Sequence, residues 1–96
     1  MKEKIGYEDS FEQPFNRIRG IFVCMVSNEL KTHVCNFEIE EYTLAGAIAE
    51  ALRKHHEYYP DHTLLSFTPV YVRVSDSWLS VSGEATTYTL NRPYGD

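Results

Sequence analysis

Two adjoining stretches decide the fold: THVCNFEIE at residues 32–40 and TLAGAIAEALRKHHEY at residues 43–58. The first alternates apolar with polar side chains, as a half-buried strand does. The second is rich in residues of high helix propensity, and Thr43 is a favourable N-cap for it. The stripe expected to face a sheet consists of Leu44, Ile48, Leu52 and His55. A strand that leads directly into one amphipathic helix is therefore expected.

A second strand is predicted just before this pair. Residues 17–27 (RIRGIFVCMVS) are apolar on both sides, which is typical of a central strand. A turn around Asn28 to Lys31 would pair them with residues 32–40 in a hairpin. The charged end of the second hairpin strand, at Glu38 and Glu40, suits an edge of the sheet.

More strands are predicted after the helix. Residues 64–74 read LLSFTPVYVRV, in which Pro69 lacks a ladder donor. The proline either places this strand at an edge or starts its regular part at Val70. Residues 78–82 and 85–90 are predicted to form the two strands of a last hairpin, with Gly83 in its turn.

Together these elements predict an α+β fold: a four- to five-stranded, mostly antiparallel sheet in the chain order β-β-α-β-β, with one helix packed on one face. A crossover through the helix puts residues 17–27 in the middle of the sheet. Residues 1–16 are expected to form an N-terminal arm, residues 17–92 a single α+β domain, and residues 93–96 a C-terminal tail.

Length and charge limit the classes of function. The chain has 96 residues, 43% of them hydrophobic, which suits one domain with one core. Nine Lys and Arg against fourteen Asp and Glu give a net charge of -5. No basic stripe is present, so direct binding to nucleic acid is not expected. No apolar run of membrane-spanning length and no signal peptide is present, which predicts a cytoplasmic protein without membrane contact.

The two cysteines leave two alternatives open. In the predicted hairpin register Cys24 faces Cys35 and Phe22 faces Phe37, so a cross-strand disulfide is geometrically feasible. In a reducing cytoplasm, two buried thiols that fill core volume are favoured. The chain has no CxxC spacing, and no catalytic role is predicted for either thiol.

The stretch KHHEYYPDH at residues 54–62 holds the candidates for metal binding, His55, His56 and His62. His55 and His56 are neighbours on a helix and point about 100° apart, so both cannot readily reach one ion. The i, i+4 spacing of helical metal pairs is absent. We therefore expect no metal site, and histidines that interact with carbonyls at the helix C-terminus instead.

Catalysis is not expected either. The chain contains no GxGxxG, GxxxxGK[ST] or GxSxG motif. Glu38 and Glu40 share a strand face, but an edge strand offers no desolvated cleft for acid–base chemistry. The sequence thus predicts a protein that is not an enzyme and needs no cofactor.

One helix can cover only one face of the sheet. If Val70, Val72, Val74 and Trp78 face the helix, the uncovered binding face consists of Tyr71, Leu79, Val81, Tyr88 and Leu90. A patch of that kind covers roughly several hundred Å², the size at which monomers use it for binding. One cover is the N-terminal arm, through Ile5, Tyr7, Phe11 and Phe15. The other is a second protein chain, either a different protein or another copy in a homodimer.

Residues 20–74 contain a hairpin, the stretch NFEIEEYTLAGAIAEAL and a following apolar strand. This arrangement resembles the small phage-encoded inhibitors of host enzymes, of the type that bacteriophage T7 directs against the RNA polymerase of its host. The resemblance covers a little over half the chain and carries over no functional residue. It implies non-catalytic binding to a host enzyme or a defence protein.

Two functions follow from these features. The first is a small protein-binding module that occupies a surface on its partner. The alternative is a homodimer that sequesters a small ligand such as a nucleotide signal. Aromatic rings would then stack on the base and an arginine would pair with phosphate. The residues for that alternative are Tyr58, Tyr59, Trp78 and Arg73.

Overall fold

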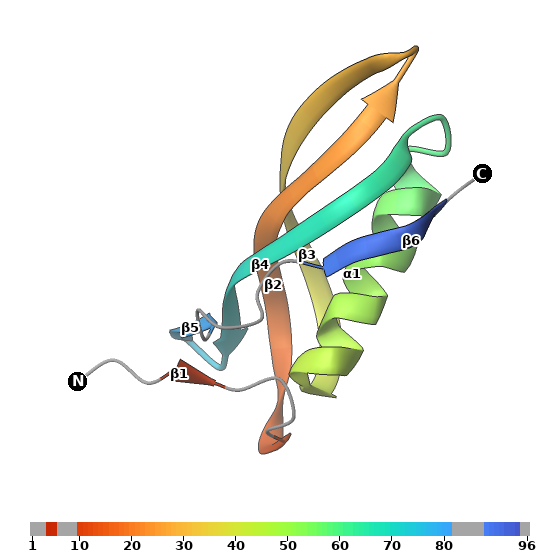
Figure 1. Ribbon diagram of the computed structural model, residues 1–96. Coiled ribbons are helices and arrows are strands. Elements are labelled where there is room, and N and C mark those ends of the chain that lie inside the picture. The colour runs from red at the N-terminus through yellow and green to blue at the C-terminus, as the bar shows by residue number, and fades with distance from the viewer. Residues whose placement is uncertain (1–3, 6–9, 82–87, 95–96) are drawn as a thin grey trace.

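The computed structural model describes residues 4–5, 10–81 and 88–94. It confirms the predicted α+β fold with one helix: β2, β3, α1, β4 and β5 follow the order β-β-α-β-β, and β1 and β6 add a strand at either end of the chain (Figure 1). The elements are β1 (Lys4–Ile5), β2 (Ser10–Val26), β3 (Glu29–Thr43), α1 (Leu44–Tyr58), β4 (Thr63–Val74), β5 (Ser77–Val81) and β6 (Tyr88–Tyr94).

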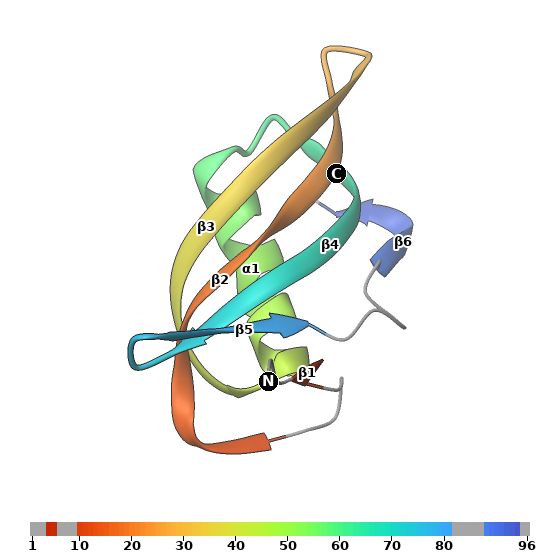
Figure 2. The ribbon, with the colours of Figure 1, turned by 90° about the vertical axis from the view of Figure 1, so that its left-hand side faces the viewer.

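The sheet has the strand order β1-β5-β4-β2-β3, and β6 also pairs with β4. β2 is antiparallel to both β3 and β4, so these two neighbours run parallel and α1 connects them. The prediction of a central first hairpin strand and an edge second strand is confirmed. Figure 2 looks onto the face of β3, β2 and β4 that is turned away from α1, which lies behind the three strands.

β2 is longer than the predicted strand. It begins at Ser10 and spans 17 residues, so residues 10–16 of the expected arm belong to the sheet. Phe15 is fully buried in the core, and the register against β3 shifts on both sides of it. Of the other arm residues, Ile5 contributes its backbone to β1. Tyr7 and the side chains of Ile5 and Phe11 lie outside the residues described.

The β2–β3 hairpin closes two residues earlier than predicted. Val26 pairs with Glu29, so the turn consists of Ser27 and Asn28 alone. Both have positive φ, 54° and 67°, as a type I′ turn requires. This turn matches the right-handed twist of the strands, and the predicted turn around Asn28 to Lys31 is wrong.

The shorter turn changes the cross-strand partners. Cys24 lies opposite Lys31, Phe22 opposite His33, Cys35 opposite Gly20, and Phe37 opposite Ile18. The predicted pairs Cys24–Cys35 and Phe22–Phe37 are therefore wrong. Both cysteines are free and buried, in agreement with the favoured alternative of two core thiols.

β4 is not an edge strand, contrary to one of the two expectations drawn from Pro69. It pairs with β2 on one side, and on the other side with β6 at residues 64–67 and with β5 at residues 71–74. Nor does its regular part start at Val70, because the strand begins at Thr63. Pro69 lies between the stretches of β4 that pair with β6 and with β5, and it is opposite Gly20 of β2 at a register shift, an irregular position of the kind where proline is tolerated in a sheet.

The last hairpin also differs from the prediction. A turn at Ser75 and Asp76 brings β5 back antiparallel to β4. β6 then pairs with β4 and not with β5, so the predicted pairing of residues 78–82 with 85–90 is wrong for the described strands. Gly83 lies outside the described residues.

The core lies between α1 and the covered face of the sheet. The helix stripe is confirmed, with Leu52 only partly buried at its margin. The fully or largely buried helix residues are Leu44, Ala47, Ile48, Ala51 and His55. Phe22 of β2 stacks on Phe67 of β4, with ring centroids 4.4 Å apart, and its ring centroid lies 4.2 Å from that of His55.

Gly20 permits the close approach of β2 to β4. A Cβ atom at this position would lie 2.6 Å from Cε1 of Phe67 and 2.6 Å from the carbonyl oxygen of Thr68. The carbonyl belongs to the backbone and cannot rotate away. At Gly46 in the first turns of α1, the nearest atom to a Cβ would instead be a side-chain oxygen of Glu41, at the end of a flexible chain.

The two glycines therefore predict opposite responses to the same substitution. Gly20→Ala should lower the free energy of unfolding by about 2 kcal/mol, because it overpacks the sheet. Gly46→Ala should leave it unchanged or raise it by up to about 1 kcal/mol, through higher helix propensity. Urea unfolding followed by the fluorescence of Trp78 measures both. Equal losses in the two variants would contradict the packing described at Gly20.

Candidate functional site

The two ends of α1 are fixed by local hydrogen bonds. At the start, the backbone N–H of Gly46 donates to the side-chain oxygen of Thr43 (3.1 Å), which confirms Thr43 as the N-cap. At the end, the N–H of Tyr59 donates to the carbonyl of His55 (2.9 Å). The N–H of His62 then donates to the carbonyl of Tyr59 (3.0 Å), which closes a turn that contains Pro60. This turn folds His62 back towards the end of the helix.

Five side chains meet where the end of α1 packs on the β2–β3 hairpin. This histidine cluster consists of Cys24 of β2, His33 of β3, His55 of α1, and Tyr59 and His62 beyond the helix. The ring of His55 lies 5.1 Å from that of His33 and 5.2 Å from that of His62, between centroids. Tyr59 stacks on His62 at 4.8 Å. The Sγ atom of Cys24 lies 3.9 Å from Nε2 of His55.

Burial sets the protonation of this cluster. Desolvation, with smaller contributions from His33, His62 and His56, lowers the pKa of His55 from 6.5 to about 4. Burial, followed by the charge of His62, also lowers the pKa of His33. Burial raises the pKa of the Cys24 thiol above its usual value of 9.0. At neutral pH the imidazoles of His55 and His33 are therefore uncharged, and the Cys24 thiol is protonated and a poor nucleophile.

His55 is poorly satisfied for a buried polar residue. Its side chain is fully buried, and its Nδ1 atom has no hydrogen-bond partner in the part of the chain that is described. Its Nε2 meets only the thiol of Cys24, a weak donor and acceptor. Nδ1 of His62 is likewise buried, with no hydrogen-bond partner among the described residues. Buried polar atoms are normally paired, so these two nitrogens call for an explanation.

The sequence predicts some members of this cluster and misses others. His55 and His62 come together, whereas His56 is not among the residues whose ligand atoms converge. Cys24 and His33 were not expected there. A type I′ turn at Ser27 and Asn28 places His33 directly opposite Phe22, beside His55, whereas the predicted register has Phe37 in that position.

The opposite face of the sheet carries the second candidate site, which we call the open face. Cross-strand partners share a face, so Ile21 lies beside Val34 and Met25 beside Leu30 on the side opposite to buried Phe22, away from α1. The side chains of Ile21, Leu30 and Val34 are 36%, 66% and 67% exposed. These large apolar residues are in contact with solvent on neighbouring strands.

An aromatic and cationic group occupies the β4–β5 part of the open face. The guanidinium carbon of Arg19 lies 4.3 Å from the centroid of the Trp78 ring, and that of Arg73 lies 5.8 Å from it. Tyr71 packs edge-on against Trp78 at 6.2 Å between ring centroids. Such cation–π contacts hold the tryptophan ring in place on the sheet.

This arrangement corrects the predicted binding face. Tyr71 lies on the open face as expected, but Trp78, expected towards the helix, lies there too because it pairs with Arg73. Leu79, expected on the open face, pairs with buried Val72 and packs against the core, and Val81 is buried. The prediction placed even-numbered residues of both strands on the helix side. Because the turn between β4 and β5 has two residues, Val74 pairs with Ser77, and Trp78 falls on the opposite face. The side chains of Tyr88 and Leu90 lie outside the described residues.

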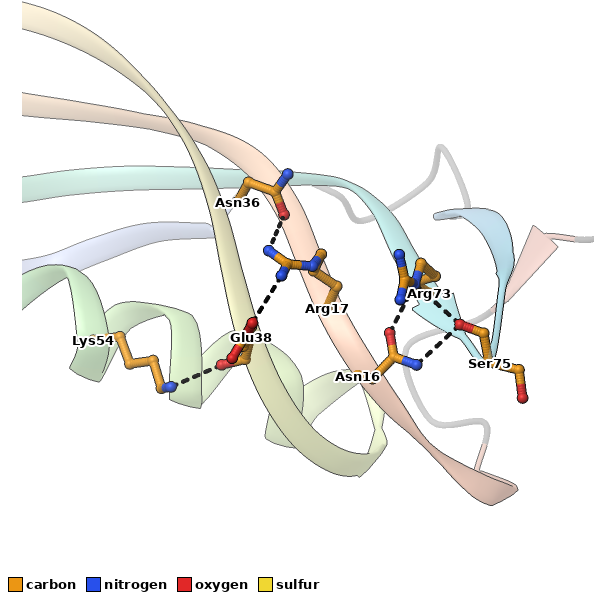
Figure 3. A network of polar contacts seen from close by, with 7 residues as sticks. All are labelled: Asn16, Arg17, Asn36, Glu38, Lys54, Arg73 and Ser75. Carbon is orange, nitrogen blue, oxygen red and sulfur yellow. Dashed lines mark hydrogen bonds and ion pairs between the residues drawn. The ribbon is translucent and has the colours of Figure 1, made fainter.

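Polar contacts join the strands at the end of the sheet beside β5 (Figure 3). Arg17 donates to Asn36 (3.2 Å) and to Glu38 (2.9 Å) across β2 and β3. Arg73 donates to Asn16 and to the carbonyl of Ser75, both at 3.0 Å. These contacts are exposed or partly exposed, so each contributes little to stability. Their effect is to fix the orientation of the two arginines on the sheet.

The residues proposed for a ligand site do not form one site. Arg73 lies near Trp78 on the open face. Tyr59 belongs to the histidine cluster at the C-terminal end of α1. Tyr58 packs beside Phe37, with ring centroids 5.7 Å apart, and its own side chain is exposed. Trp78 and Arg73 therefore lie together on the open face, whereas Tyr58 and Tyr59 lie at the C-terminal end of α1.

Comparison with known proteins identifies neither a family nor a function for the chain. No protein-family model, no curated protein and no solved structure matches the chain. Among the described residues, no helix has the length and apolar character needed to cross a membrane.

The burial of His55 predicts a pH-dependent stability in metal-free protein. A folded pKa below the unfolded value means that stability is complete above pH 6.5 and is lost as the pH falls from 6.5 towards 4. The charged or titratable groups around His55 are Cys24, His33, His56, Tyr59 and His62. For this histidine alone the loss at pH 5 is on the order of 2 kcal/mol.

The variant His55→Leu isolates that contribution. At pH 7 it should be at least as stable as the wild type, because an apolar side chain of similar size removes an unpaired buried nitrogen. At pH 5 it should be more stable by roughly 2 kcal/mol. Urea unfolding with chelator at both pH values measures the difference. Parallel losses in the two proteins between pH 7 and pH 5 would contradict a neutral, desolvated His55.

Proposed function

We propose that the protein is a small non-catalytic module that binds another protein through its open face. The observation that carries this proposal is the exposure of Ile21, Leu30 and Val34 on neighbouring strands of that face. Exposed apolar side chains that adjoin one another are typical of interaction surfaces in monomeric domains. Binding to a host enzyme or a defence protein in the cytoplasm is one form of this role.

The composition of the open face supports a protein partner. Its apolar residues lie towards the β2–β3 turn, and Arg19, Arg73 and Trp78 lie towards β5. Interfaces combine an apolar centre with a polar rim, and Trp, Tyr and Arg contribute strongly to their binding energy. Since Arg19 and Arg73 both lie against Trp78, the ring is held in advance of binding, which reduces the entropy lost on association.

The histidine cluster does not support catalysis as an alternative. Cys24 is fully buried, and burial raises its pKa, so it lacks the thiolate that a nucleophile needs. Asp61, the carboxylate nearest in sequence to His62, is exposed. Among the described residues, no carboxylate forms a hydrogen bond or an ion pair with His33, His55 or His62.

Substitution on the two faces of the domain tests the proposal. Val34→Lys places a charge in the exposed apolar group on an edge strand, where lysine is well tolerated. Ala49→Lys makes a matched change on the exposed side of α1. The three proteins are used to capture partners from cells in which the protein acts, and captured proteins are identified by mass spectrometry. We expect Val34→Lys to reduce recovery of the partner more than tenfold and Ala49→Lys to leave it unchanged.

A second copy of the chain is the competing occupant of the open face. Light scattering on the purified protein should show a monomer, for the wild type and for both lysine variants. If the wild type is a dimer and Val34→Lys is a monomer, the open face binds a second copy of the chain and not a different protein. Equal capture of the same proteins by the wild type and Val34→Lys would contradict binding through the open face.

A further inference from the structure

We propose that Cys24, His55 and His62 form a binding site for Zn²⁺ or a similar divalent transition-metal ion. The three residues come from β2, the end of α1 and the turn after it, and each offers one ligand atom. These atoms all lie within 4.8 Å of one another. The site lies on the covered side of the sheet, so it is separate from the open face and independent of the proposed function.

The donor atoms select the class of metal. A thiol sulfur and two imidazole nitrogens form the set that binds Zn²⁺, Co²⁺ and related ions. Mg²⁺ and Ca²⁺ prefer oxygen ligands, and the three residues supply none. Binding removes the proton of the Cys24 thiol, which passes to solvent or buffer as the sulfur–metal bond forms.

The spacing of the donors is close to that of a tetrahedral centre. With zinc–sulfur and zinc–nitrogen bonds of ordinary length, neighbouring ligand atoms lie roughly 3.4–3.6 Å apart. Cys24 Sγ and His55 Nε2 are separated by 3.9 Å. The distances from the ligand atom of His62 to those of Cys24 and His55 are at most 4.8 Å. They would have to shorten by about 1 Å, which requires the side chain of His62 to turn inward. That side chain is only partly buried and follows a turn, so it can move.

A second observation points to the same ligand. His55 is a fully buried imidazole with an unpaired Nδ1 and only a thiol beside Nε2. Burial of such a group costs free energy unless a partner is bound. A metal ion held by Cys24 and His62 would coordinate Nε2 of His55 in place of the weak thiol contact, and Nδ1 would then carry the ring proton. The ring of His33, 5.9 Å from that of His62 between centroids, lies beside the same site on β3.

A bound ion would join three segments that the chain brings together only on folding. Cys24 precedes His55 by 31 residues, and the described contacts between them are side-chain contacts. A metal that binds only the folded protein stabilises it by mass action. The expected effect is therefore a firmer attachment of the end of α1 to the hairpin.

The test uses tag-free protein that has been reduced and treated with chelator, then dialysed. Zn²⁺ at about 100 times its dissociation constant should raise the melting temperature by roughly 10 °C. His62→Gln is the main variant, because its partly exposed position tolerates the change. His56→Gln is the matched control, since that neighbouring histidine lies outside the converging group. The thermal shift should be retained in His56→Gln and lost in His62→Gln and His55→Leu.

Cobalt provides a readout of coordination that stability alone does not give. Co²⁺ added to the wild type should produce a thiolate-to-cobalt charge-transfer band, which Cys24→Ser abolishes while Cys35→Ser retains it. The proposal is overturned if Zn²⁺ gives no saturable thermal shift, or if His62→Gln and His56→Gln respond alike. It is also overturned if the cobalt band persists in Cys24→Ser. Val34→Lys should bind the metal normally, so loss of partner binding and loss of metal binding are distinguishable.

Discussion

The packing of Phe22 between Phe67 of β4 and His55 of α1 is the contact on which the rest of the structure depends. The ring centroids lie 4.4 Å and 4.2 Å apart in these two pairs. β2 is an interior strand between β3 and β4, and side chains along a strand alternate between the two faces. Once Phe22 is buried beneath the helix, Ile21 must face the other way. The covered core and the exposed apolar group are thus two consequences of one constraint.

The same packing places a polar residue inside the core. Leucine would fill the position of His55 without leaving a buried nitrogen unpaired, and it would favour the helix more strongly. Local departures from the most stable choice are commonly found at functional sites. The position of His55 beside Cys24 and His62 offers a chemical reason for this choice, because a metal ion would coordinate one ligand atom from each of the three side chains.

Local signals in the sequence were sufficient for the helix and the order of the long strands. Thr43 and the apolar stripe of α1 define the helix, and the two-sided apolar character of residues 17–27 defines the central strand. The hairpin register was wrong by an even number of residues. Such an error preserves the face of every side chain, since the period of a strand is two, and Cys24 and Cys35 were still assigned to one face.

The errors that changed the site came from turns and long-range contacts. At the β4–β5 turn, Val74 pairs with Ser77, so Trp78 falls on the face opposite to that of Val74 and the predicted binding face was partly inverted. In the histidine cluster, Cys24 and His55 meet through tertiary packing, which no local spacing rule reports. The metal motifs considered in the sequence assume neighbouring ligands on one helix. These motifs cannot detect a site whose ligands come from a strand, the end of a helix and a turn.

In the free protein, α1 covers one face of the sheet and leaves the apolar residues of the other face in solvent. Methyl NMR with a soluble paramagnetic agent measures this directly, since the agent relaxes only the methyl groups that it can approach. We expect strong relaxation at Ile21, Leu30 and Val34, and protection at Ile18, Ile48 and Leu64. Protection of Ile21, Leu30 and Val34 in the free monomer, or strong relaxation at Ile18 and Leu64, would contradict this arrangement.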